Sequence, residues 1–405
     1  MNNKKIAGIV CEYNPFHTGH KYQIDELRRL GYEKIVCVMS GNSVQRGELA
    51  ILDKYSRAEA AVRCGADLVL ELPYPYSSSG AEFFASAAVR ILSDAGVGTL
   101  CFGSESADLE SLTLAAQICE SDEFADEYKR LVGMGEGSAG AYFEAYKNAA
   151  SMLGINAPDG ISGSNDLLGI SYIRAVRKYR LYIDPVVIKR QGASYNDDEM
   201  SSEHAHPSAL MIRGQISKKG IEGLDGAMPK ASLDVFKKNI ERQSAPVDVK
   251  NIESAVLAFF RLADAERMSA LSIAECGGGL CEKICKCSKN ATSYDELVEM
   301  AMGKNYTAGR VKRAILACMT GATEDDIRCA PSYSTVLAFN SKGRELLASL
   351  RKKETEISFV AKPADVDKNG ERQKELSEKL DSIFTLAKPN TAPSGEYIAH
   401  SPVII

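Results

Sequence analysis

The chain has 405 residues, of which 45% are hydrophobic, so it is long enough for two or three domains with a sizeable core. Its net charge of −5 excludes a uniformly basic nucleic-acid-binding surface, and no apolar stretch is long enough to cross a membrane. The first residues lead directly into a strand-length apolar run rather than a signal peptide, so we expect a cytoplasmic protein with no membrane partner and no implied protein partner.

The first predicted strand and helix enclose a histidine motif. The apolar run Ile6–Cys11 is typical of a buried strand, and the apolar spacing of residues 18–30 predicts a helix. His17 and His20 therefore fall at a strand-to-helix turn, where the first helical N–H groups have no partner within the helix. These groups and the helix dipole favour an anion, and Gly19 lets the backbone approach a ligand closely.

His17 and His20 are three residues apart, so on a helical turn they project from one face. Two imidazoles at a helix N-terminus predict a clamp for the phosphates of ATP. The alternatives are a metal-binding pair and a purely structural turn. A closed metal site needs more ligands than two, and the other three histidines lie far along the chain, at 204, 206 and 400.

Strand-like and helix-like runs alternate through the first half of the sequence. We expect further strands at 34–39, 66–72 and 99–102, with helices at 54–64 and 81–92 between them. This order predicts an α/β fold with a doubly wound parallel sheet, which binds ligands beyond the carboxyl ends of its strands. The His17 loop and the polar segments 40–53 and 103–105 follow such ends.

The rest of the chain is predicted to be mainly helical. We expect helical structure at 108–153 with a break near 133–140, a helix at 165–180 with a cap-like start at Ser164-Asn165-Asp166, and a strand at 181–188. Beyond a polar loop at 192–207, helices are expected at 250–264, 293–301, 307–320, 343–351 and 370–386, and strands at 333–339 and 357–361. The predicted domains are 1–200 and 201–405, the second with a small α/β element near 333–361.

The eleven cysteines, in a chain without an export signal, are expected to be reduced thiols that mostly act as small buried hydrophobes. Cys276, Cys281, Cys285 and Cys287 lie within twelve residues and could hold zinc or an iron–sulfur cluster. Their spacings fit common metal-binding patterns poorly. We therefore assign no metal ligand from the sequence, and metal binding by these four cysteines stays open.

Two stretches are locally basic. Residues 170–192 hold six Lys or Arg against Asp184, and residues 301–352 hold nine basic residues against four acidic ones. A local patch is sufficient for contact with RNA phosphates, although a solvated helix face is the more common cause of such a charge run.

Several further motifs, in order along the chain, resemble one family. Phe16-His17-Thr18-Gly19-His20 resembles the HxGH motif of the nucleotidyltransferase superfamily. The other matching blocks are Glu12–His17, Met39–Asn42 with Gln45–Glu48, Asp67–Pro73, Cys101–Glu105, Asn165–Gly169, Lys189-Arg190, Ser208-Ala209 with Ile212-Arg213, Lys304 with Tyr306-Thr307 and Arg310, and Phe339-Asn340 with Lys342–Arg344. From the first strand to about residue 350, the chain resembles the tRNA(Met) cytidine acetate ligases. The segment Cys276–Cys287 departs from that pattern.

The resemblance implies an ATP-dependent ligase. Such an enzyme forms acetyl-adenylate from acetate, releases pyrophosphate, and transfers the acetyl group to N4 of the wobble cytidine of elongator tRNA(Met). The resemblance also implies a Rossmann-like, HxGH catalytic domain over 1–200 that binds ATP, and RNA binding by 201–405. Mg²⁺ on the phosphates is expected, although no dedicated carboxylate cluster for it stands out.

The family's site residues are carried over to matching positions. His17 and His20 would contact phosphates and stabilise charge as the α-phosphorus is attacked, Gly103 would lie against the nucleotide, and Asn165 and Arg190 would bind ATP from the far side of the cleft. The full expected ATP-binding set is Val10, Cys11, Glu12, Tyr13, Asn14, Pro15, Phe16, His17, Thr18, Gly19, His20, Lys21, Tyr22, Gln23, Gly103, Asn165 and Arg190.

Other roles stay open for several of these residues. Gly103 could simply permit a turn, without any contact with ATP. In the same way, Asn165 could simply cap its helix, and Arg190 could simply make a surface ion pair. Arg46, Lys54 and Arg57 could serve phosphates or RNA, or simply solvate a loop.

Two other functions compete with the ligase. A small-molecule adenylyltransferase of the same superfamily would use His17 and His20 equally well, but it leaves residues 201–405 without a task. A non-enzymatic RNA-binding protein with a nucleotide pocket would bind without turnover.

Overall fold

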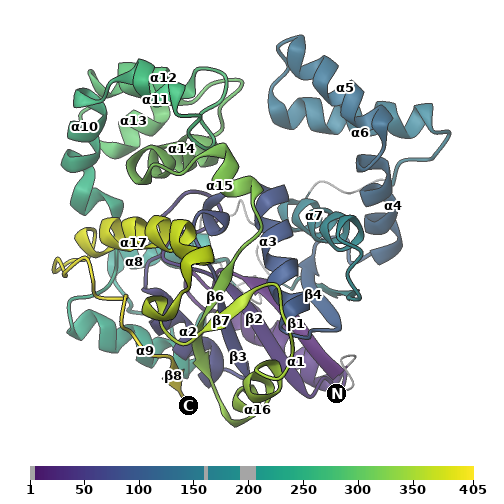
Figure 1. Cartoon of the computed structure of the whole chain (residues 1–405), viewed down its shortest axis with the longest axis vertical. Helices are drawn as coiled ribbons and strands as arrows, with labels where there is room; N and C mark the ends of the chain where they lie inside the picture. The colour runs from purple at the N-terminus through teal and green to yellow at the C-terminus, as the bar shows by residue number, and fades with distance from the viewer. Residues whose placement is uncertain (1–4, 159–162, 192–206) are drawn as a thin grey trace.

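A computed structural model describes residues 5–158, 163–191 and 207–405 of the chain. Its framework is one sheet with strand order β5-β4-β1-β2-β3-β6-β7 (Figure 1). The first five strands run parallel: β1 (Ile6–Cys11), β2 (Lys34–Ser40), β3 (Leu68–Leu72), β4 (Thr99–Ser104) and β5 (Asp184–Lys189). β6 (Tyr333–Phe339) pairs antiparallel with β3, and β7 (Ser358–Val360) and β8 (Val403–Ile404) each pair parallel with β6.

Helices cover both faces of this sheet. Alternate strand residues point to opposite sides, so Ile9 and Cys37 pack in one core with α1 (Thr18–Arg29) and α2 (Lys54–Arg63). Val36 and Val38 pack in a second core with α3 (Ala81–Asp94), α7 (Ser164–Lys178) and α16 (Ser341–Leu350). The prediction of an α/β fold with a doubly wound parallel sheet and a mostly helical C-terminal region is confirmed, and the antiparallel strand β6 is an addition to it.

Two helical lobes extend beyond the carboxyl ends of the strands (Figure 1). The first lobe consists of α4 (Leu109–Cys119), α5 (Asp122–Gly133) and α6 (Ser138–Met152). The second lobe consists of α10 (Glu253–Leu262), α11 (Ala265–Ala270), α12 (Leu280–Ser288), α13 (Tyr294–Ala301) and α14 (Ala308–Thr320). The lobes meet where Lys304 Nζ lies 3.9 Å from a carboxylate oxygen of Glu136.

The remaining helices belong to neither lobe. They are α8 (Ala209–Lys219), α9 (Lys230–Glu241), α15 (Glu324–Arg328) and α17 (Glu371–Leu386), with short 3-10 helices η2 (Tyr76–Ser78), η3 (Val249–Ile252), η4 (Pro363–Asp365) and η5 (Lys368–Gly370). In the part of the chain that the structure describes, none of these helices is both long and apolar enough to span a membrane.

Most predicted elements are found, with shifted ends. β3 begins at Leu68 rather than residue 66, β4 continues to Ser104, and β5 begins at Asp184. α8, α9 and α12 were not expected, and the expected loop at 192–207 lies almost wholly outside the described residues. The division at residue 200 stays a prediction, and β6, β7 and β8 extend the sheet that the first half begins.

The expectation of reduced cysteines throughout is wrong for one pair. Cys276 and Cys281 form a disulfide, with their Cα atoms 5.3 Å apart. The loop before α12 and the first turn of that helix bring the two residues together, which their separation of five in the sequence does not indicate by itself.

A buried ionic cluster ties the C-terminal α17 to the sheet. Lys54 Nζ lies 2.8 Å from Glu71 Oε1 and 3.0 Å from Asp381 Oδ2, and Asn42 donates to Asp381 at 2.8 Å. All four residues are buried. Burial by itself lowers the pKa of Lys54, but the Asp381 and Glu71 carboxylates outweigh burial and raise that pKa well above its usual value. The ammonium group therefore stays charged and neutralises carboxylates from two distant segments.

Replacing Lys54 with methionine should lower the free energy of unfolding by about 3–5 kcal/mol, because two buried carboxylates would lose their cation. Urea unfolding followed by circular dichroism would measure this loss. The matched control is Lys5→Met, which breaks the exposed Lys5–Glu33 pair and should cost at most about 1 kcal/mol. Equal losses in the two variants would contradict a structural role for the buried cluster.

Candidate active site

The histidine motif forms a compact, stacked pair at the start of α1. His17 is the N-cap residue, and its Nδ1 accepts a hydrogen bond from the Gly19 N–H at 3.0 Å. The His17 N–H in turn donates to His20 Nδ1 at 3.3 Å, which completes a reciprocal capping arrangement. The two rings stack with their centroids 3.7 Å apart. The sequence prediction that both imidazoles share one face is confirmed.

This capping arrangement determines the tautomer of both rings. Because each Nδ1 accepts a backbone N–H, its lone pair is in use and the proton of the neutral ring lies on Nε2. Burial, the neighbouring His17 and the Arg190 guanidinium together lower the pKa of His20 well below its usual value. His20 is therefore a neutral ring at neutral pH, with Nε2–H as its donor.

The expectation that the first N–H groups of α1 await an anion is wrong. The Thr18 N–H donates to the carbonyl of Ala227 at 3.0 Å, the Gly19 N–H to His17 Nδ1, and the His20 N–H to the His17 carbonyl at 3.0 Å. These three N–H groups therefore already have acceptors, and one acceptor, the Ala227 carbonyl, comes from the second half of the chain. What the turn can offer a phosphate is the field of the helix dipole and the imidazole N–H donors.

A buried arginine fixes the loop that leads to the pair. Arg57 on α2 donates to the carbonyl oxygens of Glu12 at 2.6 Å, Ser40 at 3.0 Å and Leu52 at 2.9 Å, and also to that of Gly41. Burial lowers the pKa of Arg57 to about 10, so the group stays charged at neutral pH. Arg57 and Lys54 therefore neither solvate a loop nor face a ligand, and both proposed roles for them are wrong.

The turn after β4 provides the opposite side of the site. Gly103 lies within β4 rather than in a turn, and a Cβ there would lie 3.2 Å from Cγ of Arg190. The Arg190 guanidinium donates to the Asn165 side-chain oxygen at 3.1 Å, and Asn165 Nδ2 donates to Glu105 Oε1 at 2.5 Å. Asn165 is the second residue of α7, whose N-cap is Gly163, so the capping alternative for Asn165 is wrong.

Two acidic residues that the sequence did not single out for roles of their own hold this turn. The buried Asp166 carboxylate accepts hydrogen bonds from the Ser104 hydroxyl, from the Glu105 N–H at 3.0 Å and from the Ser106 N–H at 3.2 Å. Glu105 in return accepts the Asp166 N–H at 3.0 Å, near the start of α7. In the sequence, Glu105 is recognisable only as an acidic residue that follows a predicted strand. That position does not reveal its contact with Asp166.

Residues of the second half also support the first loop. Arg213 donates to the carbonyl of Asn14 at 2.9 Å, and the Ser232 hydroxyl donates to that of Phe16 at 2.9 Å. These contacts join residues roughly two hundred positions apart, so no local pattern in the sequence could reveal them.

The sheet order brings the two sides together. β1 lies between β2 and β4, so the sheet reverses its order at β1 and β4, where ligands of doubly wound sheets bind. The segment from Val10 to Gln23 begins there, and Gln23 donates to the carbonyl of Cys101 on β4 at 3.5 Å. The Arg190 guanidinium is close enough to His20 to affect its pKa. The structure thus places the predicted site residues at one edge of the sheet, and their binding roles stay a prediction.

A separate cavity of about 660 Å³ lies between the loop at 47–51 and the second lobe. None of the predicted ATP-binding residues lines it. Arg213 and Lys312 pair with Glu48, Lys250 pairs with Asp295, and the Asp248 carboxylate accepts the Lys250 N–H at 2.9 Å. We assign no ligand to this cavity.

Comparison with known proteins agrees with this geometry. A family model described as HIGH Nucleotidyl Transferase matches residues 4–396. A tRNA(Met) cytidine acetate ligase of Acetivibrio thermocellus is 35% identical, with 96% of each chain covered. A protein of the same name from Clostridium kluyveri is 33% identical, with 99% of each chain covered.

Solved structures are similar over the same extent. The crystal structure of apo Thermotoga maritima TmcAL superimposes with a TM-score of 0.92 at 30% identity, with 99% of each chain covered. The same protein bound with alpha-thio ATP gives a TM-score of 0.90 at 29% identity, again with 99% of each chain covered.

The depressed pKa of His20 leads to a direct test. The His20 imidazole should titrate well below pH 6.5, its usual value, and should populate the Nε2–H tautomer when neutral. NMR of protein with ¹⁵N-labelled histidine would report both properties. Arg190→Gln should raise the His20 pKa by removing a nearby positive charge, whereas Arg29→Gln, at the far end of α1, should leave it unchanged. A wild-type midpoint at or above 6.5 would refute the assignment.

Proposed function

The chain belongs to the HIGH nucleotidyl transferase family and, within it, to the tRNA(Met) cytidine acetate ligases, and we propose that it catalyses the reaction implied by that name. It activates acetate with ATP as acetyl-adenylate and then acetylates N4 of the wobble cytidine of elongator tRNA(Met). The observation that carries the proposal is the stacked His17–His20 pair at the switch point of the sheet. Full-length similarity to the acetate ligases supports it.

In the first step, an acetate oxygen attacks the α-phosphorus of ATP, the bond to the bridging oxygen breaks, and pyrophosphate leaves. This displacement needs alignment and charge neutralisation rather than a protein nucleophile. The His20 ring supplies a neutral N–H donor, the His17 ring stacked on it supplies a second imidazole, and the Arg190 guanidinium supplies a permanent positive charge. Donors fixed before the reaction stabilise developing charge without reorganising.

The two sides of the site contact different parts of the nucleotide. The segment from Val10 to Gln23 forms the ATP-binding first loop, and its histidines contact the phosphates. Gly103 lies against the adenosine part, where the absence of a side chain allows close approach. Asn165 and Arg190 bind ATP from the other side, and their mutual hydrogen bond of 3.1 Å orients the guanidinium.

In the second step, the exocyclic amine of cytidine attacks the acetyl carbonyl carbon, and AMP leaves. The base must be splayed out of the anticodon loop to reach the adenylate, which is how proteins commonly read single-stranded RNA. Residues 201–405 provide the RNA-binding region, and the basic stretch 301–352 supplies phosphate contacts. Lys304 is well placed for this role, because its side chain is 66% exposed where the two lobes meet.

Mg²⁺ is proposed to arrive with the nucleotide. Among the described residues, the one group of side chains arranged to hold a cation consists of three cysteines, which are unsuited to Mg²⁺. The ATP phosphates themselves would therefore provide the cation's ligands. We place the enzyme in the cytoplasm, where its tRNA substrate is found.

The small-molecule adenylyltransferase remains the competing function. It accounts for the histidine pair equally well, but it gives no role to the second lobe or to the basic stretch 301–352. A non-enzymatic RNA-binding protein would give those regions a role, but it would release no pyrophosphate.

Incubation with ¹⁴C-acetate, ATP and total tRNA should transfer label to tRNA, and digestion should recover that label as N4-acetylcytidine. A reaction without ATP is the control. Pyrophosphate release that depends on another acceptor, with unlabelled tRNA, would favour the small-molecule adenylyltransferase. ATP binding without any pyrophosphate release would favour the non-enzymatic protein.

His20→Ala should reduce acetate-dependent exchange of pyrophosphate into ATP by about 10²–10³-fold, the usual loss for one preorganised donor. Binding of tRNA, measured by filter retention, should stay largely intact. The matched control is His400→Ala, whose ring stacks on Tyr55 at 3.7 Å, and its exchange rate should match that of the wild type. Unchanged exchange in His20→Ala would rule out the phosphate-clamp role.

A further inference from the structure

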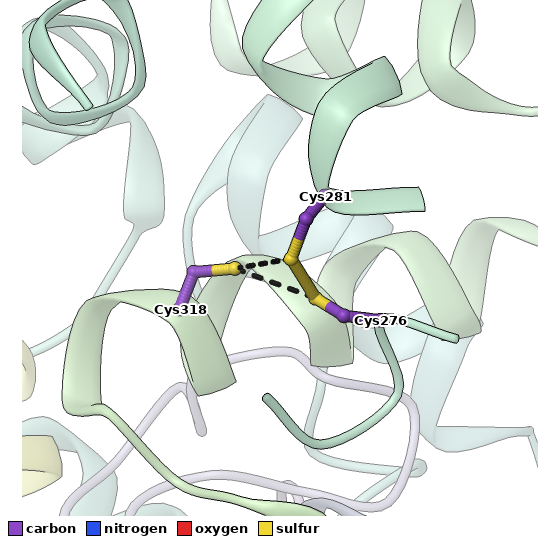
Figure 2. Close-up of side chains that lie close together, drawn as sticks. All are labelled: Cys276, Cys281 and Cys318. Carbon is purple, nitrogen blue, oxygen red and sulfur yellow. Dashed lines mark hydrogen bonds between the residues drawn. A yellow bond between two sulfur atoms is a disulfide. The ribbon is translucent and has the colours of Figure 1, made fainter. Parts of the chain in front are cut away.

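Three cysteine sulfurs meet inside the second lobe. Cys276 lies in the loop before α12, Cys281 lies on α12, and Cys318 lies on α14, and Figure 2 shows their sulfur atoms pointing toward one another. Cys318 Sγ is 3.5 Å from Cys276 Sγ and 3.4 Å from Cys281 Sγ. All three residues are buried. The third sulfur comes from a separate helix, so the cluster is more than the Cys276–Cys281 disulfide.

The spacing of the sulfurs suits one metal ion. Two thiolates on a tetrahedral zinc ion with Zn–S bonds of 2.3 Å lie about 3.8 Å apart. The two separations made by Cys318 are within a few tenths of an ångström of that value. The third separation is set by the disulfide in this structure, and it would open to a similar length once the bond is reduced. All three sulfurs lie within 4.8 Å of one another.

We propose that Cys276, Cys281 and Cys318 form a binding site for one thiophilic divalent cation, Zn²⁺ being the natural example. A dithiol reduces the Cys276–Cys281 bond by supplying two electrons and two protons, and it is itself oxidised to a disulfide. The two thiols formed in this way and the Cys318 thiol then lose three protons as they bind the cation. A soft thiolate set of this kind selects zinc over Mg²⁺ or Ca²⁺.

Cys285 is the candidate fourth ligand. It follows Cys281 by one helical turn on the same face of α12 and is buried. Cys285 lies outside the cluster of three and would need a side-chain movement to complete a tetrahedral site.

The site would fasten the glycine-rich loop 275–280 to α14. That loop already holds α14 through Arg310, which donates to the carbonyls of Glu275 at 3.1 Å and Gly277 at 2.7 Å, and through an ion pair of 2.9 Å between Arg313 and Glu275. A metal at the cysteines would lock the same two segments from the buried side. Its role is therefore structural, and the proposal does not depend on the acetate ligase activity.

Cobalt titration of the reduced, full-length protein tests the site. Protein reduced with a phosphine and desalted under argon should bind one equivalent of Co²⁺ and show thiolate-to-cobalt charge-transfer absorption. Zn²⁺ should displace the Co²⁺ and raise the Tm of the reduced protein. Cys318→Ser and Cys276→Ser should each weaken Co²⁺ binding at least tenfold, whereas Cys329→Ser, which alters an exposed cysteine, should bind as the wild type does.

The wild-type titration decides the matter even if a variant fails to fold. Absence of a saturable charge-transfer band in fully reduced wild-type protein would overturn the proposal and leave the pair as a disulfide. Equal weakening by Cys329→Ser would also overturn it, because binding would then be nonspecific. Loss of binding in Cys285→Ser as well would support the site and identify the fourth ligand.

Discussion

The geometry of the candidate active site depends on one buried guanidinium. Arg57 donates to carbonyl oxygens after β1, after β2 and before its own helix, and thereby sets the distance between the two loops. A buried cation is costly unless its N–H donors have acceptors. Four carbonyl oxygens accept hydrogen bonds from most of the N–H donors of Arg57. Because the Glu12 carbonyl is fixed in this way, the chain enters the Asn14–His17 turn in one orientation. The stacked histidines follow from that orientation.

The C-terminal half is part of the foundation of this site. The carbonyl of Ala227 accepts the first N–H group of α1, and the Ser232 hydroxyl donates to the carbonyl of Phe16. Asp381, near the end of the chain, shares Lys54 with Glu71 of β3. Residues that would bind RNA and residues that would bind ATP therefore belong to one connected structure. The second half has a structural task in addition to any contact with tRNA.

The sequence predicted features that repeat locally and missed those that depend on distant partners. Short runs rich in apolar and β-branched residues identified β1 and β6, which are buried along almost their whole length, and apolar spacing identified α1. β8 is only two residues long, which gives no period to detect. For Lys54 and Arg57 the sequence offered contact with phosphates or RNA, or solvation of a loop, because charged residues are seldom fully buried. Their burial depends on carbonyls and carboxylates that only the fold brings together.

The same distinction explains the candidate site. His17, His20 and Gly103 could be predicted because a short motif and a strand end specify them. Asn165 was open to interpretation as a cap, because the residue that contacts the start of its helix, Glu105, lies sixty positions earlier. The order of the sheet then places β4 beside β1 and brings Arg190 near His20. That neighbourhood is a tertiary property, and family resemblance rather than local pattern pointed to it.

The electrostatics of the candidate site distinguish two kinds of hydrogen-bond donor that a phosphate would meet. Arg190 carries a permanent charge, whereas His20 is held neutral mainly by burial, with His17 and the Arg190 guanidinium lowering its pKa further. A neutral imidazole with its Nδ1 already engaged donates from Nε2 at any pH above its lowered pKa. Donation from His20 therefore does not depend on a protonation event near physiological pH. Bound phosphates, being negative, would oppose the depression of this pKa. Independently of that effect, a hydrogen bond from the neutral Nε2–H to a phosphate oxygen would strengthen as negative charge develops on the leaving pyrophosphate.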